Sequence, residues 1–188
     1  DGAEAKGVVM RKMVAMVALT ALAGCGFMPK LNIGAAASAV IPEDGSLDNT
    51  YLIDVFARID VSSVQVEASV GYSQYDYNDG VGTESDLTII PVALVAKYSI
   101  GTSAANVVLG GGLVWNVTDI NEIGAGTTTV DNAAFYRIVA GANLKLPAGF
   151  GLTTEAMFDF TKDDLGSVAT GNIDTSGLKA RVAFSYNF

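Results

Sequence analysis

Charged side chains stand at alternate positions of segments whose intervening positions are apolar, so they share one face of an extended chain. Carboxylates, ammonium groups and guanidinium groups on one face can form an ion path, an acid–base site or a network that neutralises itself. The four acids and six bases in this pattern are Asp54, Arg58, Glu67, Lys97, Arg137, Lys145, Glu155, Asp159, Lys179 and Arg181.

Catalysis is constrained by the complete lack of histidine. Ser-His and Asp-His hydrolase arrangements and histidine-based metal sites are therefore excluded. The adjacent carboxylates Asp163 and Asp164 could do acid–base work, but they stand beside Lys162 in a polar segment that implies no pocket. We predict that the protein is not an enzyme and has no catalytic residue.

Metal, nucleotide and nucleic-acid binding are not indicated either. The segment 76–80 superficially resembles a calcium loop but lacks the spacing and the distal glutamate of an EF-hand. No glycine-rich phosphate loop stands between a strand and a helix. The net charge of −9 disfavours nucleic acid, whose recognition depends on Lys and Arg contacts to phosphate. We predict no metal site and no cofactor.

The elements that must position the charges are strands. Eight segments alternate an apolar position with a small, polar or charged one, and each has about the 9–11 residues that a tilted transmembrane strand needs. No apolar run approaches the roughly 20 residues of a membrane-spanning helix. Pro91 cannot donate to a strand ladder, so we expect it near a rim or at a bulge. The segments are 31–40, 51–60, 64–75, 88–100, 106–118, 134–146, 150–161 and 178–188.

The connections between these segments alternate in length. Long connections are expected at 41–50, 76–87, 119–133 and 162–177, and short ones at 61–63, 101–105 and 147–149. Outer-membrane barrels have short periplasmic turns and longer extracellular loops. An even number of strands then predicts that both termini are periplasmic.

Aromatic residues on the apolar face gather at the strand ends. This is typical of the two girdles at the interfaces of a membrane, with an aliphatic band between them. One set is Tyr51, Tyr72, Trp115, Tyr136, Phe158 and Phe160, and the other is Tyr98, Phe150, Tyr186 and Phe188.

The last segment carries a recognisable pattern. Phe184, Tyr186 and the final Phe188 resemble the C-terminal assembly signal of bacterial outer-membrane β-barrels, and residues 31–188 resemble the small OmpA/OmpX/OmpW-like superfamily. The resemblance implies an all-β fold, an eight-stranded antiparallel up-and-down transmembrane barrel in the outer membrane of a Gram-negative bacterium. It also implies contact with outer-membrane lipid, lipopolysaccharide and the barrel-assembly machinery. We expect a monomer.

The N-terminal residues have the layout of a secretory signal peptide. Met10 is a plausible start, Arg11 and Lys12 form a positive region, and residues 13–23 form an apolar region too short to span a membrane. Residues 22–25 resemble a lipobox that would make Cys25 a lipidated N-terminus, whereas Ala21-Leu22-Ala23 fits an ordinary cleavage site before Gly24. Both alternatives stay open. We predict a leader at 1–25 and a single barrel domain at 26–188.

An eight-stranded barrel is only wide enough for its interior to be filled by side chains, and Glu155 and Asp159 can lie near Lys179 and Arg181 on the neighbouring strand. We therefore expect the charged face to form a neutralising interior network. The predicted function is a structural, membrane-integrity or adhesion role through acidic loops. The alternatives are a narrow porin-like channel for small or hydrophobic solutes, and a soluble lipocalin-like ligand-binding barrel. The loop acids are Glu43, Asp44, Asp48, Asp76, Asp79, Glu84, Asp86, Asp119, Glu122, Asp131, Asp163, Asp164 and Asp174.

Overall fold

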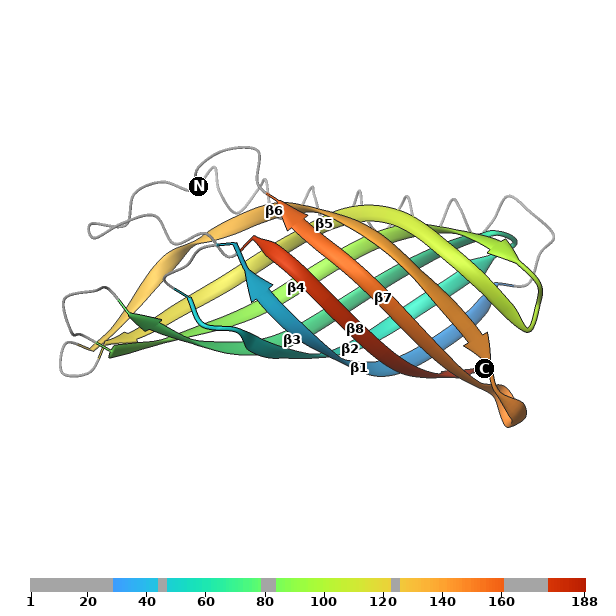
Figure 1. The fold of residues 1–188 in the computed structure, drawn as a ribbon, viewed down its shortest axis with the longest axis horizontal. Helices are drawn as coiled ribbons and strands as arrows, with labels where there is room; N and C mark the ends of the chain where they lie inside the picture. The colour runs from blue at the N-terminus through green and yellow to red at the C-terminus, as the bar shows by residue number, and fades with distance from the viewer. Residues whose placement is uncertain (1–28, 44–46, 79–83, 123–125, 161–175) are drawn as a thin grey trace, which may run out of the picture.

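The described part of the chain is a closed barrel of eight strands joined in chain order. The computed structural model describes residues 29–43, 47–78, 84–122, 126–160 and 176–188. The strands run obliquely around the long axis of the barrel (Figure 1). They are β1 (Lys30–Pro42), β2 (Thr50–Val61), β3 (Val64–Asn78), β4 (Glu84–Gly101), β5 (Ala105–Glu122), β6 (Gly126–Lys145), β7 (Phe150–Phe160) and β8 (Gly177–Asn187).

Every strand pairs antiparallel with its neighbours in the sequence, and β1 pairs with β8 to close the barrel. The ladder between β1 and β8 extends to the last residue, where the Phe188 amide donates to the Leu31 carbonyl at 2.9 Å. Closure leaves no open sheet edge, which in a membrane would expose unpaired backbone groups. The predicted fold, an all-β eight-stranded antiparallel barrel, is confirmed.

The two ends of the barrel differ. The terminal rim is the end where β1 begins and β8 ends, and it carries the connections 62–63, 102–104 and 146–149, the last of which contains the 3-10 turn η1 (Pro147–Gly149). The extended rim is the opposite end, where the β3–β4 and β5–β6 hairpins are longest (Figure 1).

The prediction of loops at 76–87 and 119–133 is wrong. Most of these residues continue the ladders, and the last pairs are Asn78 with Glu84 and Glu122 with Gly126. The reason lies in residues of high β-propensity within the two segments, such as Tyr77, Ile120 and the run Thr127–Val130, which extend the hairpins at the extended rim.

Pro91 lies inside β4, with its side chain buried, rather than at a rim. The β3–β4 ladder omits two pairs there, between Val70–Val92 and Ser73–Ile89, and the register does not shift. The residue opposite Pro91 on β5 is Asn116, and a register shift in the β5–β6 ladder begins at Asn116. The ladder is therefore interrupted at Pro91 itself, whereas the register shift lies one strand away.

Burial alternates along the strands as the sequence predicts, with apolar side chains outside and charged ones inside. Ile53 and Val55 are 63% and 55% exposed, whereas Asp54 between them is 5% exposed. Rings cluster at both ends of the outer surface: Phe150, Tyr186 and Phe188 near the terminal rim, and Tyr136 with Phe160 toward the extended rim. An outer surface this apolar suits lipid rather than water. A lipocalin-like barrel would have the reverse arrangement, so that alternative is wrong.

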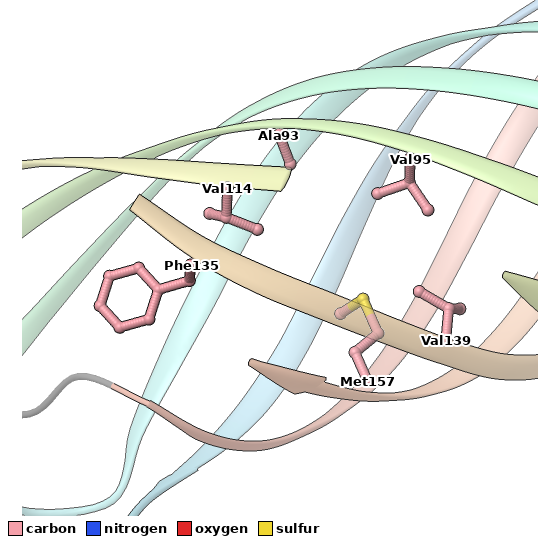
Figure 2. Close-up of a cluster of buried hydrophobic side chains, with 6 residues drawn as sticks. All are labelled: Ala93, Val95, Val114, Phe135, Val139 and Met157. Carbon is pink, nitrogen blue, oxygen red and sulfur yellow. The ribbon is translucent and has the colours of Figure 1, made fainter. Parts of the chain in front are cut away.

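Apolar side chains also fill part of the interior. Ala93 and Val95 from β4, Val114 from β5, Phe135 and Val139 from β6 and Met157 from β7 form one buried cluster (Figure 2). Within the described ranges, no helix has the length and apolarity to cross a membrane. The predicted leader and Cys25 lie outside the described residues.

Candidate functional site inside the barrel

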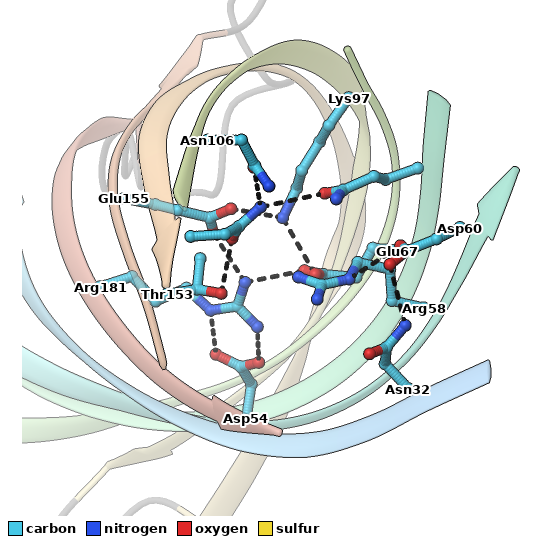
Figure 3. Close-up of polar contacts among 12 residues, drawn as sticks. Asn32, Asp54, Arg58, Asp60, Glu67, Lys97, Asn106, Thr153, Glu155 and Arg181 are labelled. Carbon is cyan, nitrogen blue, oxygen red and sulfur yellow. Dashed lines mark hydrogen bonds and ion pairs between the residues drawn. The ribbon is translucent and has the colours of Figure 1, made fainter. Parts of the chain in front are cut away.

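Two acids and two bases form a closed ring of ion pairs inside the barrel. Lys97 Nζ lies 2.9 Å from Glu67 Oε2 and 2.5 Å from Glu155 Oε1. Arg181 Nη1 lies 2.7 Å from Glu67 Oε1 and 2.8 Å from Glu155 Oε2. Each carboxylate therefore uses one oxygen for each base. The ring connects β3, β4, β7 and β8 across the interior (Figure 3).

Arg181 is the centre of this arrangement, because it also binds a third acid. Its Nη2 and Nε lie 2.6 and 3.2 Å from the two Asp54 carboxylate oxygens, which extends the network to β2. The guanidinium carbon lies 4.8 Å from the centre of the Phe56 ring, within the range of a cation–π contact. The planar fork of arginine explains how one side chain can serve three carboxylates.

A second group lies nearer the extended rim. Arg137 donates in bidentate fashion to Asp159, from Nε at 2.6 Å and from Nη2 at 2.8 Å. Lys179 Nζ also donates to Asp159, at 2.5 Å. Arg137 and Asp159 are direct partners on the β6–β7 ladder, so the ladder register itself brings them together.

A third pair lies near the terminal rim and includes a residue that the sequence prediction missed. Arg58 Nε lies 3.2 Å from Asp60 Oδ1, and Asn32 donates to Asp60 Oδ2 at 3.1 Å. Asp60 follows the same alternation as Asp54 and Arg58, so the pattern could have identified it. With Asp60 included, five acids and five bases form ion pairs, and the net charge of the paired groups is 5 − 5 = 0.

The structure places nine of the ten predicted charged residues in these three groups. Lys145 is the exception: it is exposed at the end of β6 and takes part in no ion pair among the described residues. Lys145 differs from the other nine because it lies at the end of its strand. The alternation of apolar and charged residues continues to the rim, but the enclosed interior ends before it.

Three glycines, Gly71, Gly110 and Gly141, leave space beside charged side chains, a role that the sequence prediction did not recognise. Lys97 is paired with Gly110 and Glu155 with Gly141. A Cβ at Gly141 would collide with the Thr154 carbonyl oxygen and stand 2.8 Å from Glu155 Cγ. Asp54 also faces a glycine, Gly71, where a new Cβ would stand 3.2 Å from Asp54 Cβ. Arg137 and Asp159 are paired with Gly112 and Gly177, but at these two glycines a new Cβ would meet backbone atoms of other segments. A glycine opposite a long charged residue is a signal that could have been sought in the sequence.

The predicted assembly-signal residues lie on the outer surface. Phe184, Tyr186 and Phe188 all point outward and are exposed. Tyr186 contacts both Phe150 and Phe188 in edge-to-face geometry, with ring centres 5.3 and 5.0 Å apart. Among the described residues, no three His, Cys, Asp or Glu side chains are grouped so that they could hold a metal ion.

A closed eight-stranded barrel with an apolar exterior and a charged interior defines a transmembrane β-barrel of the outer-membrane type. Solved structures of small eight-stranded outer-membrane barrels match this fold. Neisserial surface protein A matches with a TM-score of 0.59 and 15% identity, over 85% of this chain and 97% of that one. Outer membrane protein OprG from Pseudomonas aeruginosa matches with a TM-score of 0.62 and 12% identity, over 85% and 95%.

Ail, the attachment invasion locus protein of Yersinia pestis, matches with a TM-score of 0.54 and 14% identity, over 85% of this chain and 97% of that one. Neither family models nor curated proteins match the sequence. At these identities the likeness establishes the fold and not the role.

Proposed function

We propose that this chain is a non-enzymatic outer-membrane protein with a structural, membrane-integrity or adhesion role carried by its acidic segments 41–50, 76–87, 119–133 and 162–177. The observation that supports this is the ring of Lys97, Glu67, Arg181 and Glu155, which places buried, mutually neutralised charges across the interior. The acidic residues at the extended rim are then the charges that a surface partner would contact.

The proposed orientation places both termini in the periplasm and the extended rim at the cell surface, because outer-membrane barrels extend their strands and loops outward. The segments 41–50, 76–87, 119–133 and 162–177 contain thirteen acidic residues and one basic residue, Lys162. The proposed partners are lipopolysaccharide, bridged by divalent cations, or a basic surface on another molecule. Folding would use the barrel-assembly machinery, and the expected state is a monomer.

The comparison with Ail supports an adhesion role but not the same kind of partner. One structure of Ail holds the heparin analogue sucrose octasulfate, a polyanion. The acidic segments of this chain would repel a polyanion, so its partner should carry the opposite charge or be bridged by cations.

The test uses the full chain in vesicles with and without lipopolysaccharide. We expect Mg²⁺ to raise the urea midpoint of unfolding when lipopolysaccharide is present. This gain should fall in the triple variant Asp119→Asn, Glu122→Gln and Asp131→Asn. The control variant, Thr127→Ser with Thr128→Ser and Thr129→Ser, alters the same hairpin without changing its charge and should behave as wild type. An equal Mg²⁺ effect in all three proteins would refute the lipopolysaccharide role.

A narrow channel is the second candidate, and the polar lining of the interior from Asp159 to Arg58 favours it. Planar-bilayer recordings separate the two proposals. A structural barrel should leave the bilayer silent, whereas discrete conductance steps from the wild-type protein would favour the channel.

Lipidation of Cys25 is a separate proposal that rests on the lipobox resemblance of residues 22–25. Cells grown with a palmitate analogue should label the wild-type protein and not the Cys25→Ser variant. Label retained in that variant would exclude Cys25 as the lipidated residue.

A further inference from the structure

The terminal rim contains a polar cavity of about 330 Å³ that the ion-pair network does not fill. Its lining includes residues of the connections 62–63 and 102–104 and the buried side chains of Arg58, Gln65 and Asn143. This volume far exceeds the roughly 10–15 Å³ that a single buried water requires. The space is therefore large enough for a small hydrated solute.

Arg58 lines this cavity and has two donor nitrogens that form no hydrogen bond, although Nε is ion-paired with Asp60. Its side chain is 6% exposed, and its Nε and Nη1 have no hydrogen-bond partner among the described residues. Asp60 Oδ1 lies 3.2 Å from Nε as its ion-pair partner, and this oxygen too has no hydrogen bond among the described residues. A buried guanidinium with unused donors is unfavourable unless a further acceptor approaches it. The cavity is the space from which one can approach.

The charges around the cavity identify the kind of acceptor. The lining contains Lys30, Arg58 and Lys145 against the single acid Asp60, and 3 − 1 = +2. Neither lysine side chain takes part in an ion pair among the described residues, so both are available to a ligand. The Ser63 and Ser99 hydroxyls add neutral donors to the lining. An anion with several acceptor oxygens matches this set of donors.

We infer that the cavity at the terminal rim binds an oxyanion, a phosphate or carboxylate group held by the free donors of Arg58. Arg58 supplies a charge-assisted hydrogen bond to an oxygen of the anion from Nε or from Nη1, which lie on different edges of the guanidinium. Lys30 and Lys145 attract the anion at the mouth of the cavity, and Asp60 opposes it. The two members of one ion pair therefore act on the ligand in opposite directions.

The test titrates inorganic phosphate into the full chain refolded in uncharged detergent, at constant ionic strength. NMR follows the backbone amide signals of Ser63 and Ser99, which line the cavity, in every variant, and also the Nε–H signal where Arg58 is present. We expect saturable shifts. Arg58→Gln should weaken phosphate binding by about tenfold or more, the factor that corresponds to losing a charge-assisted hydrogen bond. Asp60→Asn should instead tighten binding, by roughly threefold, because it removes the opposing charge while keeping an acceptor for Asn32.

A purely structural Arg58–Asp60 pair would not produce these opposite signs. The exposed residue Lys145 provides a check that does not depend on the fold: Lys145→Gln should keep the wild-type amide spectrum and still weaken phosphate binding. Phosphate shifts that never saturate, or that are alike in wild type, Arg58→Gln and Asp60→Asn, would overturn the inference.

A second arm identifies the source of the oxyanion. The protein is placed in nanodiscs of phosphatidylglycerol or of phosphatidylcholine, without added phosphate. A shift of the Arg58 signal in phosphatidylglycerol alone would identify a lipid headgroup as the ligand, and phosphate should then compete with it. A shift that requires added phosphate in both lipids would identify a free solute.

Discussion

Arg181 and Glu155 are direct partners on the β7–β8 ladder, and their side chains meet at 2.8 Å inside the barrel. The same guanidinium binds Asp54 on β2 and Glu67 on β3, so it joins the last strand to two strands beyond the closing ladder. The interior charges therefore brace the walls of the barrel against one another. This bracing has consequences that can be measured.

Replacing Arg181 by methionine removes a base that three buried acids share. Removing one member of a buried ion pair typically costs about 3–5 kcal/mol, because it leaves charge uncompensated in a site of low polarity. We expect a loss of that size in the free energy of unfolding, measured by urea titration in lipid vesicles. The matched control is Lys145→Met, which removes an exposed base outside the network and should change stability by less than about 0.5 kcal/mol. Equal effects of the two substitutions would contradict the bracing role.

Placing an arginine on the outer surface tests whether the apolar band meets lipid. Val55 points outward at the middle of β2 and is 55% exposed. Val55→Arg should cost about 2–4 kcal/mol in vesicles, because the charge would lie near the bilayer midplane. Ile41→Arg introduces the same side chain at the end of β1 and should cost about 0–1 kcal/mol. A protein surrounded by water would show no dependence on depth.

Gly141 tests the space reserved for Glu155. Gly141→Ala should displace Glu155 and its contacts with Lys97 and Arg181, with a loss of about 1–3 kcal/mol from overpacking. The matched substitution is Gly111→Ala, where the only close atom to a new Cβ is the Arg137 carbonyl oxygen at 3.1 Å. It should cost clearly less in the same urea titration. A larger loss at Gly111 would show that the glycines do not act through the charged side chains.

The predicted assembly signal can be separated from ordinary aromatic packing. Phe188→Ala should lower the heat-modifiable, folded fraction of the protein in cells more than it lowers refolding of the purified chain in detergent. Phe160→Ala removes an outward ring of similar kind at the other end of the barrel and should leave assembly in cells closer to wild type. If both variants lose the same folded fraction in cells, Phe188 has no special role in assembly.

The fold could be predicted from the sequence because its main signal is local. A period of two residues separates Asp54 from Ile53 and Val55 without any knowledge of their neighbours in space. The same period assigns Glu155 and Arg181 to the interior, and their adjacency follows from the chain order of β7 and β8. These inferences need only a strand and its two faces.

The pairing within the interior could not be predicted, because it depends on register and on reach across the barrel. Lys97 bonds to Glu155, 58 residues away, and Arg181 bonds to Asp54, 127 residues away. The alternation of the two strand faces shows that each side chain points inward. It does not show how far along the barrel axis the side chain lies. The lengths of the β3–β4 and β5–β6 hairpins were also missed, because Thr- and Gly-containing segments are compatible with either loop or ladder.

The hydrogen bond from the Phe188 amide to the Leu31 carbonyl belongs to the ladder that should form last during folding. Every other ladder joins consecutive strands, whereas this one joins segments about 150 residues apart in the chain. Closing such a long loop of unfolded chain costs conformational entropy, so this contact becomes favourable only after the intervening hairpins have formed. Pairing of β1 with β8 should therefore be the slowest step in folding. Substitutions in the β1–β8 ladder should lower the folding rate more than they lower the stability of the folded barrel.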